Sequence, residues 1–113
     1  METEYAIEVF DKIFMVAFNY HYPQYKKMER ITNCAIIEFP GKKIYAGATI
    51  KNPHDKSDIH IARRWAFKRA VLNLWLIWTE LHITSIAFQP FWQQFRQALA
   101  KNDLYLADRR KSS

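Results

Sequence analysis

The chain is poor in the residues that build catalytic loops and cross-links. It has one cysteine, Cys34, and two glycines among 113 residues. A single cysteine cannot form an intrachain disulfide, so we expect a reducing, intracellular compartment and a small buried thiol. The sequence contains no glycine-rich phosphate loop, nucleophile elbow, paired-cysteine site or His-Glu-x-x-His helix. These absences predict a protein with no catalytic residue, no cofactor and no metal.

Long apolar runs are also missing. The apolar runs at 13–18 and 74–78 are far shorter than the ~20 residues that cross a bilayer. The N-terminus is acidic, whereas a signal peptide begins with basic residues. We therefore expect a soluble, cytoplasmic protein without a membrane partner.

Apolar and basic residues are abundant. Hydrophobic residues make up 50% of the chain and aromatic residues 16%, which is typical of one packed globular domain. The formal net charge is +6, and basic residues cluster at 26–30, 63–69 and 109–111. This charge favours phosphate, an anionic surface or an acidic protein as ligand, although a face that only aids solubility has the same pattern.

The N-terminal segment, residues 2–20, fits two interpretations. Its β-branched and aromatic side chains favour two strands joined by a turn at Asp11 and Lys12. A narrow polar stripe at helical spacing favours a helix instead. We prefer the hairpin.

The next segment predicts a second hairpin. Residues 30–39 and 43–51 are rich in strand formers and flank a Pro-Gly turn. Alternation groups isoleucine and alanine side chains on one face of each strand and places Tyr45 and Thr49 on the other. Gly47 in the second strand indicates a bulge or a close backbone approach.

The longest predicted element is a helix over residues 58–81, which no glycine or proline interrupts. Its expected buried face is Ala62, Ala66, Ala70, Leu74, Ile77 and Leu81. The second half is apolar on nearly all sides, which indicates burial in the core or in a subunit interface, and the latter predicts a homodimer. A strand over 82–88 and an amphipathic helix with Pro90 in its first turn follow. We expect a single α+β domain over residues 1–113, with a mostly antiparallel sheet, a long central helix and a C-terminal helix.

Basic and aromatic side chains supply the candidate binding site. They are His60, Arg63, Arg64, Lys68 and Arg69 on the central helix, and Tyr25, Lys26 and Lys27 before the second hairpin. Lysine and arginine neutralise phosphates and tyrosine stacks on bases, which is the chemistry of nucleic-acid binding. An acidic protein would use the same charges, and tryptophan and arginine are enriched at the hot spots of protein interfaces. A solvated helix face is the third interpretation.

A cluster of acids and histidines leaves one catalytic alternative open. The cluster is His54, Asp55, Asp58 and His60. Histidine and aspartate can share a divalent metal, and with Asp11 and Glu38 these acids would make a metal-dependent nuclease. Acids at a helix N-terminus also stabilise its positive end, which is the explanation we prefer.

One stretch combines a hairpin strand, a Pro-x-Asp turn and an alanine-rich helix. Its residues, about a quarter of the chain, are Tyr45-Ala46-Gly47-Ala48, Pro53-His54-Asp55, Asp58, Ala62, Ala66 and Arg69-Ala70. This order resembles small bacteriophage-encoded accessory proteins, which implies a factor or inhibitor of host defence that acts in the host cytoplasm. The hairpin followed by a basic helix is also similar to the end of a double-stranded-RNA-binding domain.

The leading expectation is therefore a non-enzymatic accessory factor or inhibitor that engages a host nucleic-acid-handling or defence protein. The alternative is direct nucleic-acid binding through the basic face of the central helix.

Overall fold

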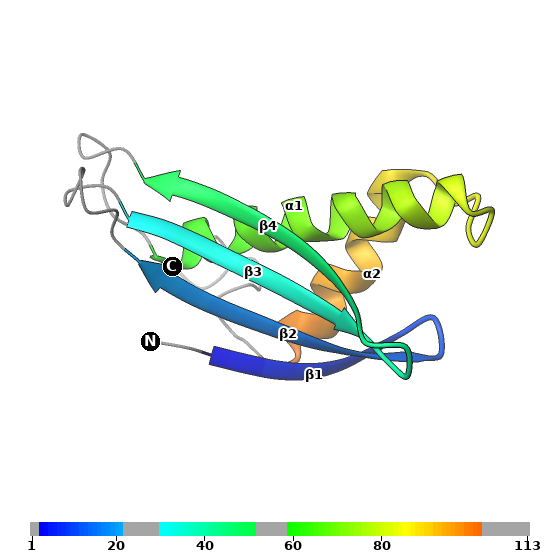
Figure 1. Ribbon diagram of the computed structural model, residues 1–113, viewed down its shortest axis with the longest axis horizontal. Coiled ribbons are helices and arrows are strands. Elements are labelled where there is room, and N and C mark those ends of the chain that lie inside the picture. Colours follow the sequence, from blue (N-terminus) through cyan, green and yellow to red (C-terminus); the bar gives the residue numbers. More distant parts are fainter. Residues whose placement is uncertain (1–2, 22–29, 52–58, 103–113) are drawn as a thin grey trace.

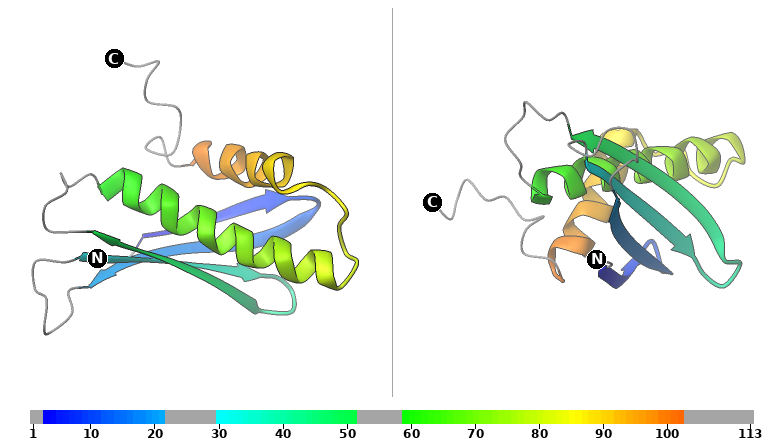
Figure 2. Two further views of the ribbon diagram at one scale, coloured as in Figure 1. Left: turned by 90° about the horizontal axis from the view of Figure 1, so that it is seen from above. Right: turned by 60° about the vertical axis from the view of Figure 1, so that its left-hand side comes forward.

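Four strands precede two helices, and both helices cover the same face of the sheet (Figures 1 and 2). The computed structural model describes residues 3–21, 30–51 and 59–102. Its elements are β1 Thr3–Val9, β2 Lys12–His21, β3 Arg30–Glu38, β4 Lys43–Lys51, α1 Ile59–Glu80 and α2 Phe88–Ala100. The strands form one antiparallel sheet in the order β1-β2-β3-β4. The predicted α+β class is confirmed.

The N-terminal segment is a hairpin, with its turn one residue earlier than predicted. Val9 pairs with Lys12, so the turn residues are Phe10 and Asp11. Both have positive φ, 53° and 61°, as a type I′ turn requires. Such a backbone is unfavourable for a bulky residue. The Phe10 ring packs against Phe91 of α2 at 5.3 Å between centroids, which fixes the turn against the helix layer.

The second hairpin is confirmed, and Gly47 lies in it without a bulge because β3 and β4 pair along their whole length. Instead, α1 approaches the strand here. A β carbon on Gly47 would lie 2.5 Å from the carbonyl oxygen of Ala66 and would also collide with the amide of Ala70. Only glycine allows this backbone contact, so the close approach is the correct alternative.

The sheet has one buried face and one open face. The side chains under the helices are Ile7, Val9, Phe14, Val16, Phe18, Cys34, Ile36 and Tyr45, and the predicted burial of Cys34 is confirmed. The side chains predicted to share a face in β3 and β4 do so, and it is the open one: Ile31, Ala35 and Ile37 of β3, and Ile44, Ala46, Ala48 and Ile50 of β4. No element in the described ranges lies over that face (Figure 2).

Helix α1 agrees with the prediction, but its buried face turns along its length. Ala62, Ala66, Ala70 and Leu74 are buried, whereas Ile77 is 41% exposed and Leu81, just beyond the helix, is 55% exposed. Steps of four residues drift around a helix that has 3.6 residues per turn. The core contacts therefore pass to the side chains Phe67, Val71 and Trp78.

The predicted strand over 82–88 is wrong. His82 has a φ of 60°, and the amide of Ile83 donates to the Trp78 carbonyl at 2.8 Å, which ends α1 in a turn. A further strand would have to pair with a sheet edge. Helix α1 covers the edge of β4, and α2 packs against β1. The predicted final helix is confirmed as α2, with Phe91, Trp92, Phe95 and Leu99 buried.

Candidate binding surfaces

The basic residues of the central helix do not form a single patch. Arg63 is only 6% exposed. Its Nη2 donates to the Tyr5 hydroxyl at 3.1 Å, and its guanidinium lies 4.6 Å from the centre of the Phe18 ring. These contacts hold α1 against β1 and β2. Arg63 is therefore part of the packing between helix and sheet and does not face an external ligand.

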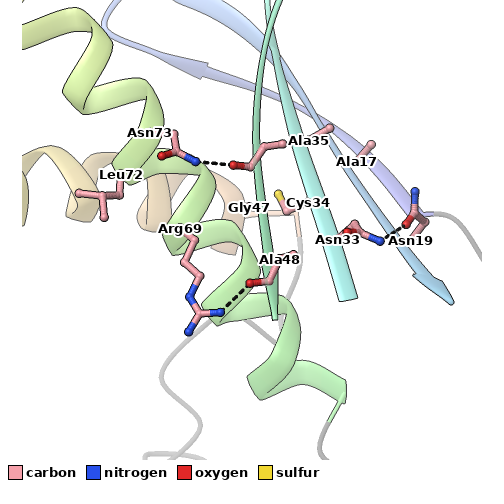
Figure 3. Close-up of a pocket in the computed structure, with 11 residues that line it drawn as sticks. Ala17, Asn19, Asn33, Cys34, Ala35, Gly47, Ala48, Arg69, Leu72 and Asn73 are labelled. Carbon is pink, nitrogen blue, oxygen red and sulfur yellow. Dashed lines mark hydrogen bonds between the residues drawn. The ribbon is translucent and has the colours of Figure 1, made fainter. Parts of the chain in front are cut away.

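Arg69 points toward the opposite flank of α1. Its Nη1 donates to the Ala48 carbonyl at 2.6 Å, and Asn73 Nδ2 donates to the Ala46 carbonyl (Figure 3). Both carbonyls lie on the outer edge of β4, where strand pairing would otherwise use them. The Arg69 side chain is exposed at this edge.

Arg64 and Lys68 point away from the sheet and flank a small pocket. The pocket has a volume of about 200 Å³ and is lined by Ile61, Arg64, Trp65, Lys68 and Trp92. Lys68 Nζ lies 5.5 Å from the centre of the Trp65 ring and 5.8 Å from that of Trp92. Cations over indole rings are stabilised by the ring quadrupole. The two α1 cations are thus placed beside a half-exposed indole.

We call the apolar side chains on this side the outer face of α1: Ile61, Trp65, Leu72 and Leu76. They are 56%, 50%, 37% and 49% exposed. Their spacing of four, seven and four residues keeps them on one stripe of the helix. The second half of α1, predicted to be buried, therefore exposes one side within the described chain.

Other predicted site residues lie outside what the structure describes. Residues 22–29 and 52–58 include Tyr25, Lys26, Lys27 and the two acids Asp55 and Asp58. His60 is in the first turn of α1, but its side chain is not described. Within the described part, no three metal-ligating side chains come together.

The two described acids of the nuclease alternative have different structural roles. Asp11 occupies the β1–β2 turn. Glu38 is buried and accepts hydrogen bonds of 3.1 Å from Lys12 Nζ, Tyr45 Oη and Trp78 Nε1. Burial raises the pKa of Tyr45, and the adjacent Glu38 carboxylate raises it further. This network ties β2, β3, β4 and α1 together, so Glu38 serves the fold.

A wider groove crosses the open face of the sheet (Figure 3). It has a volume of about 670 Å³. We call it the transverse groove, and its floor is Ala17, Asn19, Asn33, Ala35, Ala46 and Ala48. Arg69, Leu72 and Asn73 wall it at the β4 edge. Asn33 Nδ2 donates to Asn19 Oδ1 at 3.0 Å and lies 3.2 Å from His21 Nδ1.

Sequence reasoning missed Trp65 and the groove. Trp65 falls outside the predicted buried series of α1, seven residues before Leu72. That spacing was a usable signal. The sequence signal for the groove was weaker. The alternation along β3 and β4 groups the groove's alanines on one face but does not indicate whether a helix covers that face.

Comparison with protein-family models, curated proteins and solved structures gave no match. Neither described helix is both long and apolar enough to span a membrane.

Proposed function

We propose that this chain is a small non-enzymatic binding protein, an accessory factor that engages a protein partner through the outer face of α1. The observation that carries the proposal is the exposure of Trp65, Leu72 and Leu76 on one stripe of a helix whose other side forms the core. Contiguous exposed apolar side chains mark interaction sites in soluble proteins.

The surroundings of this stripe indicate the chemistry of the partner. Arg64, Lys68 and Arg69 flank the apolar side chains, and tryptophan and arginine are the residues most enriched at interface hot spots. A partner with an apolar ridge bordered by acidic residues is complementary to this surface. The resemblance to phage accessory proteins supports a host nucleic-acid-handling or defence protein as the partner.

Direct nucleic-acid binding is the second candidate. It is favoured by the pocket in which the Trp65 ring lies beside Lys68 and Arg64. A base can stack on an exposed indole while the two cations neutralise neighbouring phosphates. Arg63, which the sequence placed in this site, does not contribute.

Affinity capture with the immobilised full chain tests the leading proposal. We expect wild type to retain one stoichiometric partner and Trp65→Ala to lose it. The matched control is Trp75→Ala, because Trp75 is half-buried against Phe88 and lies off the stripe. Both variants must keep the wild-type amide spectrum. Capture that is the same for wild type and Trp65→Ala contradicts the proposal.

Fluorescence anisotropy with labelled single- and double-stranded DNA and RNA at two salt concentrations tests the second candidate. Binding should weaken steeply with salt and disappear in Arg64→Glu/Lys68→Glu. Lys42→Glu/Lys101→Glu is the control, because it makes the same charge change at two exposed lysines away from α1. The absence of binding at low salt removes nucleic acid as a direct ligand.

The homodimer stays a prediction and would use the same stripe. Light scattering over a concentration series decides it. A dimer that Leu76→Glu dissociates supports a second copy as the partner, and a strict monomer excludes it.

A further inference from the structure

We propose that the transverse groove binds one amphipathic α-helix of a protein partner, which lies across the strands with its N-terminus at β1 and its C-terminus at Arg69. This site is additional to the outer face of α1. The floor of the groove lies on the opposite side of the sheet from the helices (Figures 2 and 3). The two surfaces meet at Leu72, which lies in both, and at Arg69, which walls the groove and flanks the outer face of α1.

The pairing register gives the groove its shape. Across the sheet, Ala17, Ala35 and Ala46 stand in one row, and Asn19, Asn33 and Ala48 stand in the next. Larger side chains stand in the rows on both sides: Met15, Ile37 and Ile44 on one, and His21, Ile31 and Ile50 on the other. These outer rows are six residues apart along a strand, roughly 20 Å. A helix with its side chains is about 10–12 Å wide and fits between them.

The sheet edges disfavour an added strand as the occupant. The β4 carbonyls of Ala46 and Ala48 already accept hydrogen bonds from Asn73 and Arg69. At the other edge, α2 packs against β1, and Asn102 Nδ2 donates to the Ala6 carbonyl of that strand at 3.5 Å. Strand addition needs free backbone groups along an edge. The surface that is left for a partner is therefore the open face of the sheet and not its edges. A concave face of this kind accepts a convex element such as a helix.

The lining also disfavours nucleic acid and a second copy. The described residues that line the groove include no aromatic ring for bases to stack on, and Arg69 is the one cation among them. Two copies that met through their open faces would place one concave alanine floor over the other and leave a void, which forfeits packing contacts. An apolar helix face fills the groove instead.

The charges at the two ends select the direction of the helix. Glu4 pairs with Ala17 at the β1 end and is exposed, and Arg69 is exposed at the β4 end. A helix carries partial positive charge at its N-terminus and partial negative charge at its C-terminus. Each partial charge of the helix meets a side chain of opposite sign when the N-terminus lies at Glu4 and the C-terminus at Arg69. Four strands span about 14 Å, which corresponds to about ten helical residues.

The test uses two lactam-bridged helical peptides and the isotopically labelled full chain. Both peptides carry leucine and alanine on one face. The first has lysine near its N-terminus and glutamate near its C-terminus, and the second has these charges exchanged. We expect NMR shifts at Ala17, Ala35, Ala46 and Ala48, and about three- to fivefold tighter binding of the first peptide. A spin label on its N-terminus should broaden Glu4 more strongly than Arg69.

Three variants complete the test. Ala35→Arg fills the floor and should weaken binding at least about tenfold, whereas Ala87→Arg, the same change at an exposed residue outside the groove, should not. Arg69→Gln keeps donors for the Ala48 carbonyl, so it should retain binding but reduce the preference between the peptides, because Glu4 is then the one end charge that remains. The amide spectrum of each variant reports its fold, and Ala46→Arg, at a more exposed floor position, serves if Ala35→Arg fails to fold.

Three results would overturn this inference: no groove shifts with either peptide at about 1 mM, equal affinity of both peptides for wild type, or shifts confined to the outer face of α1. None of them would affect the proposed function, because capture that depends on Trp65 is measured separately.

Discussion

Gly47 of β4 and Ala66 of α1 are in backbone contact: a β carbon on Gly47 would lie 2.5 Å from the Ala66 carbonyl oxygen. This contact sets the distance between the helix and the sheet. It also brings Arg69 and Asn73 within reach of the outer carbonyls of β4. One glycine thus determines both how α1 packs and how the sheet edge is closed.

Gly47→Ala should therefore destabilise the protein. We expect a loss of about 1–3 kcal/mol in the free energy of unfolding, because the added methyl group meets backbone that cannot move aside. Urea unfolding measures the change. Gly41→Ala is the matched control, since its β carbon would have no neighbour nearer than 4.0 Å, and it should stay within about 0.5 kcal/mol of wild type. Equal effects of the two substitutions would refute the contact.

The buried carboxylate of Glu38 should contribute more to the free energy of unfolding than an exposed carboxylate does. Glu38→Gln removes the negative charge that Lys12, Tyr45 and Trp78 donate to. Hydrogen bonds to charged groups contribute about 1.5–3 kcal/mol, so we expect a loss of about 2 kcal/mol. Glu8→Gln makes the same change at an exposed position on β1 and should cost less than about 0.5 kcal/mol. Chemical denaturation of both variants checks the prediction, and a loss at Glu38 no larger than that at Glu8 contradicts it.

Tyr45 should make stability fall at alkaline pH. Burial, and then the Glu38 charge, raise its pKa above the ordinary value of 10.0. Between the two pKa values the folded state holds a proton that the unfolded chain has lost. The stabilisation is therefore complete below about pH 10 and is lost as the pH rises above it.

Unfolding free energies measured across this pH range should fall more steeply for wild type than for Tyr45→Phe. The phenylalanine variant keeps the ring and has no hydroxyl to ionise. The same slope in both proteins would show that Tyr45 does not contribute.

Cys34 should be inert toward thiol reagents in the folded protein. It is 1% exposed, and burial raises its pKa, so very little reactive thiolate is present. We expect labelling by iodoacetamide to be slow under native conditions and to accelerate when urea unfolds the chain. Because this is the single cysteine, mass spectrometry reports one adduct. Rapid labelling without denaturant would place the thiol at the surface.

Much of the fold could be predicted because its signals are local. The turn at Pro40 and Gly41, the alternation along β3 and β4, and the uninterrupted run of helix formers in α1 each involve residues close in the chain. The same holds for Gly47, whose presence in a strand indicated a close approach. The predicted turn after β1 lies one residue too late, because Phe10 is not a typical residue at positive φ.

The candidate site was less predictable, since it depends on the direction each side chain takes. Arg63 and Arg64 are neighbours with the same charge, yet one lies against the Phe18 ring and the other faces out. A step of 100° around the helix separates them, and only the position of the sheet shows which is inside.

Patterns between residues close in the chain suffice to predict the antiparallel hairpins, the length of α1, the final helix and the grouping of small residues on one face of the sheet. Only the packing of distant segments shows that no described element covers this face, that Arg63 is packed while Arg64 and Lys68 flank Trp65, and that residues 82–88 form no strand. The reason is physical: period-two and period-3.6 patterns define faces, but which face is buried depends on what packs against it from distant parts of the chain.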